Sequence, residues 1–161
     1  MNIVKSKLNL LNRELEALEF NRRVLALAQN LKIPLLERLK YICIVSSNLD
    51  EFFEIRIAVL KEQLRKNPKS KTQDGLVVGD AYLKIVKETQ TLVSHKYKIF
   101  QKDILPRLER EGIHLHFESA WTPSQHRWAK TYFEKELVPL LTPIVLDPAH
   151  PFPKVINKSL N

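Results

Sequence analysis

The sequence predicts a mainly α protein, in which an N-terminal helical bundle is followed by the truncated start of an α/β domain. Two observations lead to this fold class. Between residues 12 and 110, apolar residues recur every three or four positions, which is the spacing of one helical face. In residues 113–117, apolar residues instead alternate with histidines, as in a half-buried strand. We therefore expect a helical domain at residues 1–110 and an incomplete α/β domain at residues 111–161.

The first helix is expected to begin near Asn12 or Arg13 and to end before the connection between Asn30 and Pro34. Its inward face should consist of Leu15, Leu18, Arg22, Leu25 and Ala28, widened by Phe20, Val24 and Leu27. Pro34 suits the first position of a second helix, because the N–H group that proline lacks has no partner there. This second helix should be heavily buried, since apolar residues dominate it.

A polar segment, Ser46–Glu51, interrupts the apolar pattern of the second helix. Asn48 is predicted to be an N-cap, with Glu51 as its capping-box partner, so that a new helix starts here. The carboxylates of Asp50, Glu51 and Glu54 admit another interpretation as acid–base groups, but their spacing also suits the first turn of a helix, where negative charge is favourable. A helix start explains the segment without a ligand.

The remaining elements follow from loop and capping signals. Residues 66–74 are polar and contain a proline, which predicts an exposed loop. A long helix should follow and end at Gly112, with a kink or division at Pro106. Thr122 is predicted to cap a helix that runs from Pro123 to about residue 140. Residues 113–117 and 142–146 are predicted strands, which with one helix bury too little surface to stand alone.

Composition limits the classes of function. The chain has 161 residues, of which 44% are hydrophobic, and a formal charge of +8 from 26 basic and 18 acidic residues. This charge suits a polyanion such as nucleic acid, an acidic membrane surface or polyphosphate, although mixed signs are also typical of a solvated surface. Neither a secretory signal nor a membrane-spanning run is recognised, so we expect a cytoplasmic protein.

The residue types that usually carry chemistry form no recognisable motif. The single cysteine, Cys43, excludes an intramolecular disulfide and is expected to be a buried small hydrophobic residue. Five histidines lack carboxylate or cysteine partners at a metal-binding spacing, and three glycines are too few for a phosphate-binding loop. We therefore predict no catalytic residue and no metal ligand within this chain.

Three segments together resemble a known family. "NRELEALEFNRRVLALAQN", "IPLLERLKYICIVSSNLDEFFEIRIAVLKEQ" and "LVPLLTPIVLDPAHPFPKVINKSLN", in this order, closely resemble the N-terminal part of bacterial polyphosphate kinase. That family has a catalytic core similar to phospholipase D. It reversibly transfers the terminal phosphate of ATP to polyphosphate through a phosphorylated histidine, with magnesium. The resemblance implies a helical N-terminal domain followed by the start of the middle α/β domain.

The resemblance also implies where the family's residues lie. Asn48, in "SSNLDEFF", matches the family's N-terminal contact to ATP, so its amide would donate to a phosphate oxygen beside the free N–H groups of a helix start. The phosphohistidine, the magnesium ligands and the groups that hold polyphosphate would lie outside this chain, and His150 is not the nucleophile. Glu16 and Ala17 stand where the family usually has Ser-Trp, which puts an adenine contact there in doubt.

The expected function is thus the ATP-binding and assembly portion of a polyphosphate kinase, inactive by itself. The resemblance implies ATP and polyphosphate as partners of the complete enzyme, a homo-oligomer, no nucleic acid, and a location in the cytoplasm or at the membrane periphery. Two alternatives from other classes stay open. One is a non-catalytic helical interaction module, and the other is a basic module that binds nucleic acid.

Overall fold

The computed structural model describes residues 10–117, 120–149, 151–153 and 155, which form two compact units that divide after Ile113. Helices make up most of the described residues, and an isolated bridge between Lys71 and Val77 is the β-type pairing recorded among them. The predicted mainly α fold class is therefore confirmed.

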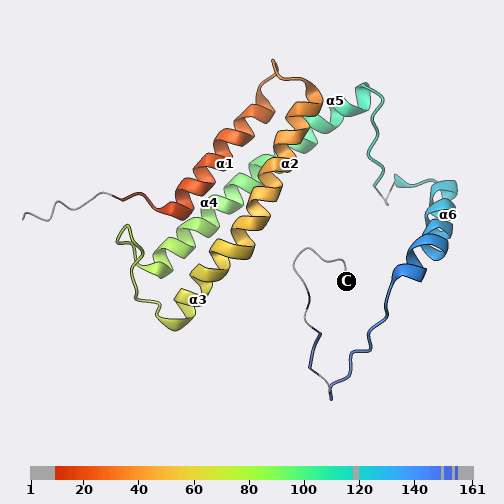
Figure 1. The fold of residues 1–161 in the computed structure, drawn as a ribbon. Helices are drawn as coiled ribbons and strands as arrows, with labels where there is room; N and C mark the ends of the chain where they lie inside the picture. The colour runs from red at the N-terminus through yellow and green to blue at the C-terminus, as the bar shows by residue number, and fades with distance from the viewer. Residues whose placement is uncertain (1–9, 118–119, 150, 154, 156–161) are drawn as a thin grey trace, which may run out of the picture. The chain divides into compact units, whose positions relative to one another are not determined.

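The first unit contains three helical rods that pack side by side (Figure 1). The first rod is α1 (Arg13–Gln29), which begins where the sequence predicted and is capped by Asn12. The second is continuous and consists of α2 (Leu35–Glu51), the π-helix η1 (Phe52–Ile57) and α3 (Ala58–Lys66). The third consists of α4 (Val78–Ile99), the π-helix η2 (Phe100–Ile104) and α5 (Leu105–Arg110).

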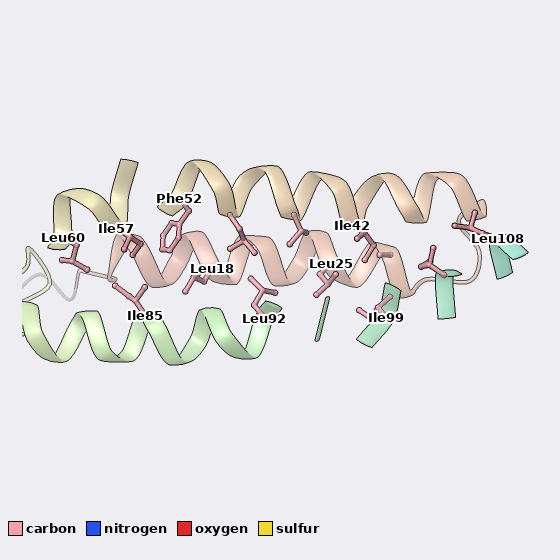
Figure 2. Packing of buried hydrophobic residues seen from close by; sticks show 14 of the residues in the cluster. Leu18, Leu25, Ile42, Phe52, Ile57, Leu60, Ile85, Leu92, Ile99 and Leu108 are labelled. Carbon is pink, nitrogen blue, oxygen red and sulfur yellow. The ribbon is translucent and has the colours of Figure 1, made fainter. Parts of the chain in front are cut away.

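A single hydrophobic core lies between these rods (Figure 2). It contains Leu18 and Leu25 from α1, together with the following buried residues of the other two rods: Ile42, Val45, Leu49, Phe52, Ile57, Leu60, Val78, Ile85, Leu92, Ile99, Ile104 and Leu108. Each such side chain contributes about 1.5–3 kcal/mol by leaving water. The three- and four-residue spacing that predicted the helices is therefore also the spacing that stabilises the unit.

Some residues predicted to be buried lie on the outer surface. Phe20 and Leu27 of α1 are exposed, and so is Cys43 of α2, so these predictions are wrong. The reason is the rotation of about 100° per residue along a helix. Phe20 and Leu27 follow buried residues by two positions, at Leu18 and Leu25, which turns them to the opposite side of α1. An apolar residue type alone does not decide burial.

The polar segment Ser46–Glu51 is not a helix start. Residues 46–51 form the last turns of α2, and the N–H of Phe52 donates to the carbonyl oxygens of Asn48 and Leu49. Asn48 is therefore not an N-cap, and its surroundings are not a helix N-terminus with free N–H groups. The helix continues because Val45, Leu49 and Phe52 keep the apolar spacing through the segment and are buried. Pro34 occupies the N-cap position of α2 rather than its first helical position.

The third rod passes Pro106 without a break. The π-helix η2 immediately precedes this proline, and the N–H of Leu105 donates to the carbonyl of Phe100. A proline removes one backbone donor, and a local change of helical pitch is one way in which a helix accommodates that loss. The rod ends at Arg110, and Gly112 follows with a φ of 77°, the left-handed conformation that glycine adopts most readily.

The second unit contains α6 (Pro123–Tyr132), η4 (Phe133–Leu137) and η5 (Val138–Leu140). Its start is as predicted, because Thr122 and Gln125 form a complete capping box. The two predicted strands, residues 113–117 and 142–146, are not formed. Extended segments need a neighbouring strand for their backbone groups, and none of the described residues supplies one. Within the described part of the chain, no helix is both long and apolar enough to span a membrane.

Candidate functional site

Asn48 belongs to a pair of amides that links α1 to α2. Its Nδ2 donates to Oδ1 of Asn21 at 2.9 Å, and Nδ2 of Asn21 donates to the carbonyl oxygen of Ala17 at 2.8 Å. Asn21 is only 5% exposed, whereas Asn48 is half-buried at the edge of the helix interface. The family resemblance pointed to Asn48 but not to Asn21, which lies 27 residues earlier in the chain.

This chain of hydrogen bonds fixes how both amides are oriented. A backbone carbonyl can only accept, so Asn21 must turn Nδ2 towards Ala17 and Oδ1 towards Asn48. Asn48 must then turn Nδ2 towards Asn21. Its Oδ1 and its second N–H have no partner among the described residues. Every fully buried side-chain nitrogen or oxygen of those residues has a partner, so the Oδ1 of Asn48 reaches the surface.

The surface beside Asn48 is apolar and acidic. One turn before it lies Ile44, which is exposed. One turn after it lies Glu51, which is also exposed and, like Asp50, has no ion-pair partner among the residues described. Residues three or four positions apart share one helical face, so Ile44 and Glu51 border Asn48. The region therefore carries negative charge and an exposed apolar surface.

A second polar contact joins α2 to α4. Nζ of Lys96 donates to Oγ of Ser46 at 2.8 Å, and that hydroxyl donates to the carbonyl of Ile42 at 3.0 Å. Lys96 is 8% exposed, and its ammonium group also lies 4.6 Å from the centre of the Tyr97 ring. Ser46 thus serves packing between helices and does not cap one. Its contact lies towards α4, whereas Asn48 faces α1.

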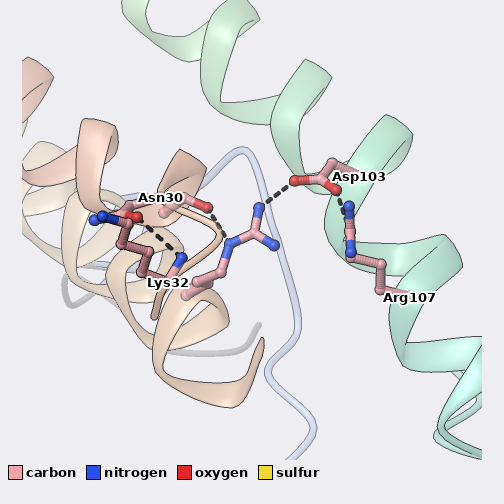
Figure 3. A network of polar contacts seen from close by, with 6 residues as sticks. Asn30, Lys32, Asp103 and Arg107 are labelled. Atoms are coloured by element: carbon pink, nitrogen blue, oxygen red, sulfur yellow. Dashed lines mark hydrogen bonds and ion pairs between the residues drawn. The ribbon is translucent and has the colours of Figure 1, made fainter. Parts of the chain in front are cut away.

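A third network, at the end of the bundle, centres on Arg38, which is 2% exposed. Its Nε donates to the carbonyl of Ala28 at 2.7 Å, and its Nη2 donates to Asp103, which also accepts from Arg107 (Figure 3). Partial burial raises the pKa of Asp103, but the hydrogen bonds from Arg107 and Arg38 lower it more, so the net pKa lies below its ordinary value. The sequence signal for this network was an arginine one turn before Ile42, on the apolar face of α2.

Two polar contacts hold α1 against the third rod and the loop that precedes this rod. Nδ2 of Asn12 donates to both carboxylate oxygens of Asp74 at 3.2 Å, and Arg22 pairs with Glu88. These residues line a pocket of about 350 Å³ together with apolar side chains. Burial raises the pKa of Asp74, but hydrogen bonds from Thr72 and Asn12 bring the net pKa below its ordinary value. Four acidic and two basic side chains line the pocket, which makes it unsuitable for an anion.

No group of three or more metal-ligating side chains occurs among the described residues, and His150 lies outside them. His114 and His116 have ring centres 6.3 Å apart. The carboxylates of Asp50 and Glu51 are on the surface of α2, as noted above. Of the sequence-predicted site residues, Asn48 alone joins a defined polar contact between elements.

Comparisons with known proteins identify the relatives of this chain. Residues 10–116 match the polyphosphate kinase N-terminal domain, and residues 124–161 match the polyphosphate kinase middle domain. The polyphosphate kinase of Burkholderia multivorans is 56% identical over 152 residues, which are 94% of this chain and 22% of that protein. The polyphosphate kinase of Paraburkholderia phytofirmans is 55% identical over 152 residues, which again cover 94% of this chain and 22% of that protein.

A solved structure is also similar. The crystal structure of polyphosphate kinase from Porphyromonas gingivalis aligns with a TM-score of 0.67 and 31% sequence identity. The alignment covers 91% of this chain and 20% of that chain. The present chain therefore spans about a fifth of the length of the relatives it matches.

Proposed function

Because the chain belongs to the polyphosphate kinase family, we propose that it provides the N-terminal, nucleotide-side part of an enzyme that transfers the terminal phosphate of ATP to polyphosphate. The observation that carries this proposal is the match over 94% of the chain to the N-terminal region of such enzymes.

Within this part, Asn48 is proposed to contact ATP. Two facts support it as the contact: the family resemblance of "SSNLDEFF", and an amide whose acceptor and second donor have no protein partner among the described residues. A buried or half-buried amide with unused hydrogen-bonding capacity is suited to a polar ligand. The magnesium ion and the phosphorylated histidine would be held by residues outside this chain.

The partners of the complete enzyme are proposed to be ATP, polyphosphate and a second copy of the enzyme, in the cytoplasm. The charge of +8 favours a polyanionic substrate. This charge is not concentrated near Asn48, where Asp50, Glu51 and Glu54 lie. The polyphosphate chain is therefore expected to bind elsewhere.

The test is a chimera in which this chain replaces the matching 152 residues of the Burkholderia multivorans enzyme. It should synthesise polyphosphate from ATP, and Asn48→Ala should raise the KM for ATP by about three- to tenfold, the usual worth of one or two neutral hydrogen bonds. The control is Ser46→Ala, which removes a hydrogen bond from the other side of α2 and should leave the KM unchanged.

Two results would count against the proposal. A chimera that folds and assembles but produces no polyphosphate would show that this chain does not supply the N-terminal part. An active chimera whose Asn48→Ala variant keeps the original KM for ATP would remove Asn48 from the binding site. Assays well below the melting temperature keep the stability loss of either variant from affecting the kinetics.

A further inference from the structure

We propose that Asn48 recognises the purine base of the nucleotide rather than a phosphate, and that Asn21 is the positioning residue that makes this recognition selective for adenine. The inference rests on the proposed function, in which Asn48 contacts ATP. It comes from the amide pair itself, because the pair leaves Asn48 one free acceptor and one free donor, and fixes which is which.

A phosphate does not match this pattern. Phosphate oxygens accept hydrogen bonds, so they could use the one free N–H of Asn48 but would face its Oδ1 unfavourably. The backbone cannot add donors, because Asn48 lies inside a continuous helix and not at its N-terminus. Phosphate sites at helices depend on such free N–H groups. The structure thus removes the reason for which the sequence favoured a phosphate contact.

The surroundings of Asn48 also disfavour a phosphate. Glu51 lies one turn away on the same helical face and is exposed. Its negative charge, so close to a polyanion, would repel it. Ile44, one turn before Asn48, is exposed and offers apolar surface to a flat, uncharged ring.

The adenine ring presents the complementary pattern. Its exocyclic amine donates beside a ring nitrogen that accepts, and an asparagine amide binds this edge with two hydrogen bonds. On its Watson–Crick edge, guanine has a carbonyl oxygen in place of that amine and an N–H in place of the accepting ring nitrogen, so donor and acceptor are exchanged. To bind guanine equally well, the amide of Asn48 would have to turn over.

Asn21 prevents that turn. If the Asn48 amide rotated, its Oδ1 would face Oδ1 of Asn21, two acceptors at hydrogen-bonding distance. Asn21 cannot rotate to compensate without losing its bond to Ala17 and placing one oxygen against another. Both orientations of Asn48 would be available only if Asn21 were absent. The discrimination between bases therefore depends on a residue that contacts no base.

The experiment measures kcat/KM for ATP and for GTP in the chimera described above. The original chain should prefer ATP by about tenfold or more, since a site that hydrogen-bonds one group rejects an analogue that cannot pair with it. Asn21→Ala should reduce the ATP:GTP ratio severalfold, partly through improved use of GTP. Loss of stability alone would not improve GTP use.

Two further variants separate positioning from folding. Asn21→Asp retains an acceptor facing Asn48, so it should preserve the ATP:GTP ratio even if it lowers the melting temperature. Ser46→Ala, on the other side of α2, should leave the ratio unchanged. With purine riboside triphosphate, which lacks the exocyclic amine, Asn48→Ala should cost less than it does with ATP, because one of the two contacts is already missing.

The outcomes distinguish this inference from the function on which it rests. If Asn48→Ala raises the KM for ATP and GTP equally and Asn21→Ala leaves their ratio intact, Asn48 binds ATP through another group and the base-recognition proposal is wrong. If Asn48→Ala affects neither nucleotide, the proposed ATP contact is wrong as well, and the amide pair serves only to join α1 to α2.

Discussion

Removing the carboxylate of Asp103 should destabilise the bundle more than removing Asp103 and Arg38 together. The guanidinium of Arg38 is 2% exposed and keeps only the carbonyl of Ala28 as a partner once Asp103 is replaced by alanine. An uncompensated charge in a protein interior is costly, whereas a buried ion pair replaced by apolar residues of similar size often costs little. The double variant is therefore expected to be more stable than Asp103→Ala because Arg38 is buried, whatever the strength of the ion pair.

The expected loss in the free energy of unfolding follows from the exposure of Arg38 and Asp103. Breaking a fully buried pair costs about 3–5 kcal/mol. The side chain of Asp103 is 32% exposed, so water can partly replace it, and about 2–3 kcal/mol is expected for Asp103→Ala. For a unit of about 100 residues this corresponds to a fall of roughly 10–20 °C in the melting temperature. The double variant Arg38→Met, Asp103→Ala should recover at least about 1 kcal/mol of that loss.

The assay is urea denaturation of the purified chain, followed by far-ultraviolet circular dichroism. Arg65→Met is the control, because Arg65 forms an exposed pair with Glu62 and should leave the midpoint nearly unchanged. If Asp103→Ala had no larger effect than Arg65→Met, Arg38 would not be a buried charge that depends on Asp103. If the double variant were less stable than Asp103→Ala, the packing contacts of the Arg38 side chain would be worth more than the cost of its unpaired charge, and the prediction would be wrong.

Further predictions concern the cap, acid stability, exchange and activity. Asn12→Ala should cost about 1 kcal/mol in the same titration, because Asn12 caps α1, while Thr122→Ala in the second unit should not move the transition. The pKa of Asp103 is depressed in the folded state. Ionisation of Asp103 therefore stabilises the fold at any pH above the ordinary aspartate pKa of about 3.9, and this contribution is lost as the pH falls through the folded-state pKa. Asp103→Asn should remove this part of the acid dependence in denaturation curves measured between neutral and acidic pH. Hydrogen exchange should be faster at residues 123–140 than at residues 13–110, because no residue of the former helices is buried, and equal protection would contradict this. The purified chain with ATP and magnesium should produce neither phosphohistidine nor polyphosphate; either product, detected with labelled ATP, would place a nucleophile within it.

The features that were predicted correctly depend on residues that are close to one another in the sequence. The helices were predictable because burial requires apolar residues at three- and four-residue spacing, and α1 begins where Asn12 can cap it. The capping box of Thr122 and Gln125 is likewise a local hydrogen-bonding pattern. In each case, the residues that cause the structure lie within a few positions of one another.

The errors arise where tertiary packing outweighs a local preference. Asn48 has good capping chemistry, worth about 1 kcal/mol, but burial of Val45, Leu49 and Phe52 contributes about 1.5–3 kcal/mol for each side chain. The helix therefore continues through the polar segment. The partners of Arg38 lie 10 and 65 residues away, which no local pattern reveals.

The candidate site was predictable only in part. Resemblance to a family points to Asn48, but a phosphate-binding role would need a helix start at this residue, and α2 continues through it. What orients Asn48 is an amide 27 residues away on another helix. Its unused donor and acceptor became visible only when that contact was known, because the hydrogen-bonding capacity of an amide says nothing of which atom faces outward.

The amide pair can serve the bundle, the ligand or both, and the two roles make different demands on its residues. For stability, a polar pair in a helix interface has no clear advantage over an apolar one, since replacing both partners with apolar groups of similar shape is often nearly neutral. Asn21→Leu with Asn48→Leu should therefore preserve the melting temperature far better than Asn48→Leu alone, which leaves the 5%-exposed Asn21 without its donor. If that double variant in the chimera were stable and still preferred ATP to GTP, the pair would not be the source of base selection. If it were stable but used the two nucleotides alike, the presence of two amides at this interface would be explained by recognition, because folding does not need them.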